Sequence, residues 1–140
     1  MFSSQTFELL TGHWLFEPQG CEEWCREDDH LAKMMELTGE RFSTSLLGRS
    51  DLRDTYFGGT GECFFSDWCL NLRYSLGNLL RIDSLIPVSI EEALSNYGVE
   101  DIGPTAQFIR DCLRFDPDER PSIKEIQSHT WLHFAWVCGG

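Results

Sequence analysis

Acidic side chains are the residues of this sequence whose type and spacing could do chemistry. From Glu17 to Asp29 the chain carries six acids and a single base, Arg26. In the helix predicted next, Asp29, Lys33 and Glu36 share one face, and Asp29 and Lys33 have the spacing of a helical ion pair. Carboxylates gathered in this way attract basic partners. The alternative is that Asp29 caps its helix and the other acids form a solvated surface.

The sequence offers little support for other site chemistry. It contains no phosphate-binding loop, no Gly-x-Ser-x-Gly elbow and no His-Glu-x-x-His motif. His129 and His133 lie four residues apart, as metal ligands on a helix often do, but no third ligand is near them in the sequence. We therefore expect no metal site, and the residues taken alone indicate a binding or structural module.

The cysteines do not form a recognisable framework. No Cys-x-x-Cys pair and no zinc-like spacing occurs, so we expect plain reduced thiols. The six are Cys21, Cys25, Cys63, Cys69, Cys112 and Cys138.

Composition narrows the class of protein. The 140 residues and 16.1 kDa fit one domain, and 41% hydrophobic with 13% aromatic residues argue against disorder. A formal charge of −12 disfavours binding to nucleic-acid phosphates. Because no apolar run is long enough to span a membrane and the N-terminus lacks a signal-like segment, we expect a soluble cytoplasmic or nuclear protein.

A helix must position the acidic face. The sequence predicts that Asp28 or Asp29 caps this helix and that Gly39 ends it. Its packed side is predicted to consist of Leu31, Met34, Met35 and Thr38.

The remaining elements predict a mainly α fold with long loops. A short helix is expected over residues 7–10, loops with short helical turns over 40–90, and a helix over 90–94 capped by Ser89. Pro104 is predicted to occupy the first position of a later helix. Ser122 and Glu125 form the capping box of a last helix that ends around residues 129–131. The apolar stripe of the helix that contains Pro104 is expected to be Phe108, Ile109, Cys112, Leu113 and Phe115.

Four short motifs occur in an order that resembles a known family. They read FELLTG and LFEP (7–12 and 15–18), REDDHL and MELTG (26–31 and 35–39), FIRDCL and DPDERPS (108–113 and 116–122), and HTWL (129–132). In this order they resemble the helices after the activation segment in eukaryotic Ser/Thr protein kinases, and specifically in the SR-protein kinases. The resemblance implies that residues 1–140 form a single partial kinase domain, a fragment of the C-terminal lobe.

The resemblance also implies a substrate and a docking surface. SR-protein kinases hold basic Arg/Ser-rich splicing proteins in an acidic groove and phosphorylate their serines with ATP and magnesium. Asp29 and Glu36 match two groove acids, and Glu22 matches a further acid upstream. The sequence departs from the family pattern at His13, where an acid is expected, and at Asn96, where a lysine is expected.

The motifs of phosphoryl transfer are missing. Kinases need a Gly-rich loop, a strand lysine, a catalytic aspartate with its asparagine, and the Asp-Phe-Gly magnesium ligand, none of which occurs in this sequence. By this resemblance, we expect the chain to correspond to the kinase sequence from within the helix that follows the activation segment. We therefore expect no catalytic, cofactor-binding or metal residue here, and no phosphoryl transfer by this polypeptide alone.

Two further expectations follow from the resemblance. In kinases the arginine that matches Arg120 pairs with the glutamate of an Ala-Pro-Glu motif, which this sequence lacks. Because an unpaired buried charge costs about 3–5 kcal/mol, the structural role of Arg120 requires that it be exposed or bound to a nearby acid, and the fragment should be only marginally stable. The candidate acids are Asp116, Asp118 and Glu119. Residues 67–76 separate two halves of one family segment and are predicted to be an insert, either a loop peculiar to this protein or unspliced sequence.

Three readings remain open at this stage. The chain is a fragment of an SR-protein-kinase-like enzyme, a non-catalytic docking module for Arg/Ser-rich peptides, or a degenerate product without independent function. Missing catalytic motifs favour the last two readings for the chain itself, and nothing in the sequence separates them.

Overall fold

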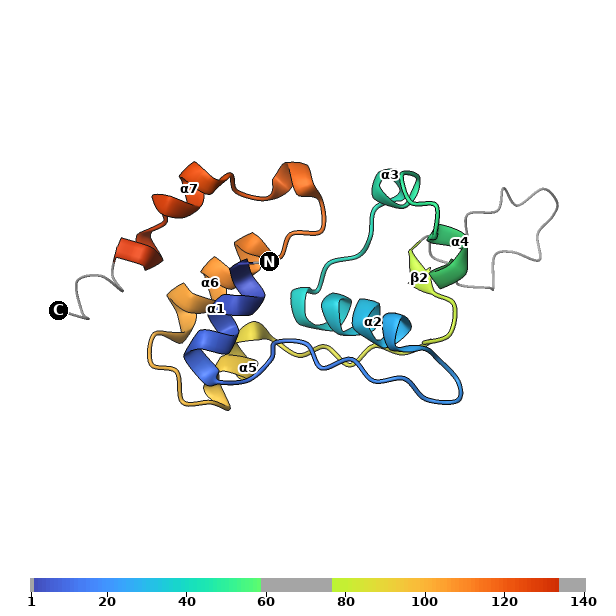
Figure 1. Ribbon diagram of the computed structural model, residues 1–140, viewed down its shortest axis with the longest axis horizontal. Helices are drawn as coiled ribbons and strands as arrows, with labels where there is room; N and C mark the ends of the chain where they lie inside the picture. The colour runs from blue at the N-terminus through green and yellow to red at the C-terminus, as the bar shows by residue number, and fades with distance from the viewer. Residues whose placement is uncertain (1, 59–76, 134–140) are drawn as a thin grey trace.

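The computed structural model describes residues 2–58 and 77–133 of the chain. This part is mainly helical, as predicted, with one two-stranded antiparallel sheet (Figure 1). In chain order the elements are α1 (Phe2–Thr11), α2 (Arg26–Thr38), α3 (Thr44–Leu47), α4 (Arg53–Tyr56), β1 (Phe57–Gly58), β2 (Asn78–Leu79), α5 (Ile90–Ser95), α6 (Ile102–Cys112), the 3-10 turn η2 (Pro117–Glu119) and α7 (Ile123–Gln127).

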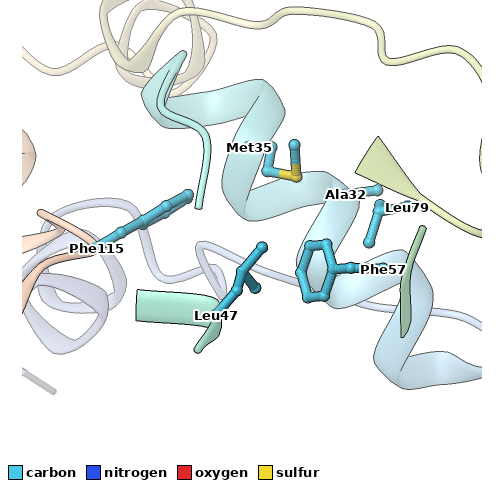
Figure 2. Packing of buried hydrophobic residues seen from close by; sticks show 6 residues of the cluster. All are labelled: Ala32, Met35, Leu47, Phe57, Leu79 and Phe115. Atoms are coloured by element: carbon cyan, nitrogen blue, oxygen red, sulfur yellow. The ribbon is translucent and has the colours of Figure 1, made fainter. Parts of the chain in front are cut away.

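Two hydrophobic cores organise these elements. Helices α1, α5 and α6 form the first, here called the α6 core, whose buried members are Phe7, Ile90, Leu94, Ala106 and Ile109. The second, here called the α2 core, lies between α2, α3 and the small sheet, and its members are shown in Figure 2: Ala32, Met35, Leu47, Phe57, Leu79 and Phe115. The acidic helix α2 thus has a core of its own.

Helix α2 ends as the sequence predicts but begins differently. Gly39 takes a left-handed conformation with φ of 69°, and its N–H donates to the carbonyl of Met35 at 3.0 Å. At the other end Cys25 is the residue before the helix, and Asp28 is its third residue. The Asp28 carboxylate reaches back to accept from the Cys25 N–H at 3.0 Å, so Asp28 caps from inside the helix, and the expected start at Asp28 or Asp29 was wrong.

The packed side of α2 is also rotated from the prediction. Its fully buried residues are Asp28, Ala32 and Met35, whereas Leu31 and Met34 are only partly buried against the α2 core. An alanine and a charged aspartate occupy the centre of this side because they lie nearest the sheet and the returning chain. Apolar periodicity alone could not indicate a buried carboxylate.

Helix α6 differs from its prediction at both ends. It begins at Ile102, so Pro104 is the third helical residue and not the first. The missing N–H of proline is harmless at either position, because the first-turn N–H groups have no helical partner. Phe115 lies beyond the helix and is buried in the α2 core, where it stacks on Phe42 with ring centroids 4.2 Å apart.

The C-terminal elements agree with the capping prediction. The Ser122 N–H donates to Glu125 Oε2 at 2.7 Å, and the Glu125 N–H donates to Ser122 Oγ at 3.4 Å. Helix α7 nevertheless stops at Gln127, and a separate helical turn covers residues 130–133. The Trp131 indole in that turn donates to the buried Thr105 hydroxyl at 2.8 Å, which fastens the turn to α6.

The sheet was missed, because two-residue strands show no alternation and their partners are far apart in the sequence. Phe57 pairs with Leu79 and Gly58 with Asn78. The predicted insert 67–76 and the cysteines Cys63, Cys69 and Cys138 lie outside the described residues. Cys21, Cys25 and Cys112 are free thiols. Among the helices described here, none is long and apolar enough to cross a membrane.

Candidate docking site

Asp29 holds the loop before α2 against the helix. Its Oδ2 accepts the Gln19 N–H at 2.7 Å and forms an ion pair with Lys33 Nζ at 3.1 Å. Lys33 in turn donates to the Glu17 carbonyl at 2.8 Å. The predicted pair between residues four apart is therefore present, and it also serves to dock the loop. Within the described residues Oδ1 of Asp29 makes no hydrogen bond, so it remains available to a basic group.

Glu36 holds the chain after β2 in a similar way. Its Oε1 accepts the Ile86 N–H at 2.8 Å, and its backbone carbonyl accepts the Val88 N–H at 3.3 Å. Glu36 follows Asp29 by two helical turns, so both carboxylates lie on one side of α2. Each of them anchors a flanking segment through one oxygen, which fixes its position before any partner binds.

A groove lies beside Glu36, between the C-terminal half of α2 and the chain that follows β2. It encloses about 610 Å³. Its apolar lining is Met35, Leu79, Ile82, Leu85 and Pro87, and its polar lining is Glu36, Gly39, Glu40, Arg41, Asn78 and Asp83. Asp29 does not line this groove. Of the two acids predicted on α2, the structure places Glu36 in the groove and Asp29 two helical turns before it.

The other positions singled out from the sequence lie apart from this groove. Glu22 is exposed in the loop before α2. The His13 ring stacks on Tyr97, next to Asn96, with ring centroids 4.6 Å apart. The two departures from the family pattern are thus brought close to each other at the ends of α1 and α5.

Arg120 is exposed, one of its two expected outcomes. Its guanidinium donates to the backbone carbonyls of Arg114 at 2.6 Å and Phe115 at 3.3 Å rather than to an acid. Of the candidate acids, Glu119 pairs with Arg114, and Asp116 Oδ1 lies 3.8 Å from Arg49. Arg114 also pairs with Glu40 Oε1 at 2.8 Å. The hydrogen bond that Arg114 donates to Glu119 and the charge of Glu40 raise the pKa of the Arg114 guanidinium.

Sequence reasoning missed an ion pair under α2 in which the carboxylate is buried and the arginine is partly exposed. Asp28 is 0% exposed, and Arg81 Nη1 lies 2.9 Å and 3.0 Å from its two carboxylate oxygens. Burial on its own raises the pKa of Asp28, but hydrogen bonds from the Cys25 thiol and N–H and from Arg81 outweigh burial and lower it. The pair joins residues 53 apart in the chain, so no local pattern could reveal it.

The acidic side chains of α2 and of the loop before it can bind positive charge. Within residues 2–58 and 77–133, no group of three or more His, Cys, Asp or Glu residues could hold a metal ion.

Comparisons with known proteins find relatives that match nearly the whole chain. The serine/threonine-protein kinase spk-1 of Caenorhabditis briggsae is 31% identical over 129 residues, which are 90% of this chain and 10% of the relative. The serine/threonine-protein kinase SKY1 of Saccharomyces cerevisiae is 28% identical over 90% of this chain and 15% of its own length. SRSF protein kinase 3 of Homo sapiens is 27% identical over 91% of this chain and 20% of its own length. The chain therefore spans a fifth or less of these relatives, and no protein-family model matches it.

Proposed function

We propose, from the premise that this chain corresponds to a segment of the SR-protein kinases, that it carries the substrate-docking part of such an enzyme. The partner is a basic Arg/Ser-rich peptide, and the docking residues are Asp29 and Glu36, with Glu22 as an outlying acid. The observation that carries the proposal is the groove beside α2, into which Glu36 projects a carboxylate whose Oε2 makes no hydrogen bond within the described residues.

Charge supports this assignment. A chain of net charge −12 attracts a basic peptide over long range and raises its rate of association. Two carboxylates two turns apart on α2 can then hold two arginines of an extended peptide. The anchoring of Asp29 by Gln19 and of Glu36 by Ile86 reduces the conformational entropy that binding would cost.

The fold assignment supports the same proposal. The helical segment is proposed to be part of a kinase C-terminal lobe, because its order of motifs is that of the family and its relatives are protein kinases. Serine phosphorylation of Arg/Ser-rich splicing proteins, with ATP and magnesium, is proposed for the longer kinases and not for the residues present here. A protein that meets such partners would work in the cytoplasm or the nucleus.

Docking can be tested by fluorescence anisotropy with a labelled peptide of alternating arginine and serine and the full 140-residue chain. The double variant Asp29→Asn/Glu36→Gln removes both charges and keeps oxygens that can accept the Gln19 and Ile86 N–H groups. Each exposed charge pair is worth about 0.2–1 kcal/mol, so we expect the double variant to bind about two- to thirtyfold more weakly. Added salt should weaken binding by the unmodified chain as the Debye length shortens.

A charge-matched variant separates docking from simple attraction to an acidic protein. Asp51 and Glu100 are exposed, and neither lines the groove. The variant Asp51→Asn/Glu100→Gln changes the net charge equally and should bind nearly as the unmodified chain does. Equal weakening by both double variants would contradict a defined docking face.

A further inference from the structure

Asp83 and Arg41 are charged residues of the groove to which the family pattern assigns no role. Both are exposed. They come from the two segments that form the groove, because Arg41 lies just after α2 and Asp83 lies after β2. Arg41 Nη1 donates to Asn78 Oδ1 at 2.7 Å. Asp83 makes no hydrogen bond or ion pair within the described part of the chain. The groove thus carries one acid without a partner among the described residues, Asp83. It also carries one base, Arg41, whose hydrogen-bond acceptor Asn78 is uncharged.

Glu36, the residue already proposed to dock peptide, holds the segment that contains Asp83 against α2. The Ile86 N–H donates to Glu36 Oε1 at 2.8 Å and the Val88 N–H donates to the Glu36 carbonyl at 3.3 Å. These two bonds lay the segment that contains Asp83 along α2. Asp83 and Glu36 therefore approach one groove from the two segments that form it.

The third acid of the groove is already neutralised. Glu40 Oε1 pairs with Arg114 at 2.8 Å, and Glu40 Oε2 accepts the Phe115 N–H at 3.0 Å. The charges that remain to meet a ligand are therefore those of Glu36, Asp83 and Arg41. The apolar lining that is open to a ligand includes Leu85 and Pro87, which suits the aliphatic stem of a long basic side chain.

We infer that Asp83 is a second carboxylate of this groove, clamping with Glu36 the basic side chain of a docked peptide, and that Arg41 limits the affinity. The inference rests on the proposed docking function. The proposed ligand is an extended peptide with an arginine whose guanidinium lies between the carboxylates of Glu36 and Asp83, which belong to two different segments. A guanidinium presents donors along several edges of one plane, so two carboxylates can bind it together. The positive charge of Arg41 opposes that ligand and keeps its dissociation fast.

The two residues give opposite results in one anisotropy titration with the alternating arginine–serine peptide. Asp83→Asn should weaken binding about 1.4- to 5-fold, and Arg41→Gln should tighten it by a similar factor. Asp51→Asn and Lys124→Gln are the matched controls, because both residues are exposed outside the groove. Arg41→Lys keeps the charge and should leave binding within twofold of the unmodified chain.

The outcomes distinguish the inference from the function on which it rests. If Asp29→Asn/Glu36→Gln leaves binding unchanged, the proposed docking function fails. If that variant weakens binding while Asp83→Asn behaves like Asp51→Asn, docking stands and the clamp is overturned. If Arg41→Gln weakens binding, Arg41 acts as a support through Asn78 and its limiting role is overturned. Thermal unfolding of each variant, expected to match the unmodified chain, shows that the changes act on binding.

Discussion

Replacing Phe115 by alanine is expected to lower the free energy of unfolding by about 3–5 kcal/mol, the cost typical of deleting a buried aromatic ring. Phe115 is 5% exposed and stacks on Phe42, and it lies in the α2 core although α6 ends shortly before it, at Cys112. The ring of Phe115 therefore connects the segment after α6 to the α2 core. Urea unfolding followed by circular dichroism measures the loss.

A second phenylalanine provides the comparison. Phe16 is half-buried beside His30, with ring centroids 5.4 Å apart, and belongs to neither core. Phe16→Ala should cost clearly less than Phe115→Ala. A loss below about 1 kcal/mol for Phe115→Ala would contradict its packing in the α2 core. Circular dichroism of Phe115→Ala without denaturant should still show helix, because the α6 core does not include Phe115.

Replacing Asp28 by alanine is expected to cost about 2–3 kcal/mol. Breaking a fully buried ion pair costs about 3–5 kcal/mol, but Arg81 is 40% exposed and can recover water when its partner is lost. The substitution also removes the carboxylate that accepts the Cys25 N–H at the start of α2. Glu100→Ala is the control, because Glu100 is exposed and its loss should change the free energy of unfolding by less than about 0.5 kcal/mol. Equal losses for both variants would contradict a buried role for Asp28.

Asp28 should also contribute to the acid sensitivity of the fold. Its pKa lies below the usual value in the folded chain, so its stabilising contribution is complete above about pH 4 and disappears as the pH falls through the lowered pKa. Asp28→Asn has no such titration. We therefore expect the difference in stability between the unmodified chain and Asp28→Asn to be constant from pH 5 to 7, roughly, and to shrink below about pH 4. Melting temperatures measured at matched ionic strength test this, and a difference that grows in acid would contradict it.

Local signals predicted several helix caps correctly. Gly39 ends α2, and Ser89 caps α5 through its side chain, which accepts the Glu92 N–H at 3.0 Å. Ser122 and Glu125 cap α7 as their spacing indicates. Such signals are readable because a cap or a stop depends on residues within one turn.

Contacts between distant segments could not be predicted. Phe115 was assigned to the stripe of α6, because periodicity counts apolar residues without showing which core receives them. Asp28 was predicted only as a possible helix cap, because its partner Arg81 lies 53 residues away in the chain. In the docking site, the resemblance indicated Glu36 but not Asp83, since the second wall of the groove comes from a separate segment.

The pairing of Glu40 with Arg114 and the Phe115 N–H connects the groove to the end of α6. Glu40 lines the groove, whereas residues 114 and 115 belong to the segment that follows α6. A peptide that holds the groove in shape would therefore also favour the state in which these bonds are closed. Through thermodynamic linkage, such a ligand would make the opening of a helix that it never touches less favourable. Any change that loosens the end of that helix would lower the affinity of the groove by the same coupling free energy.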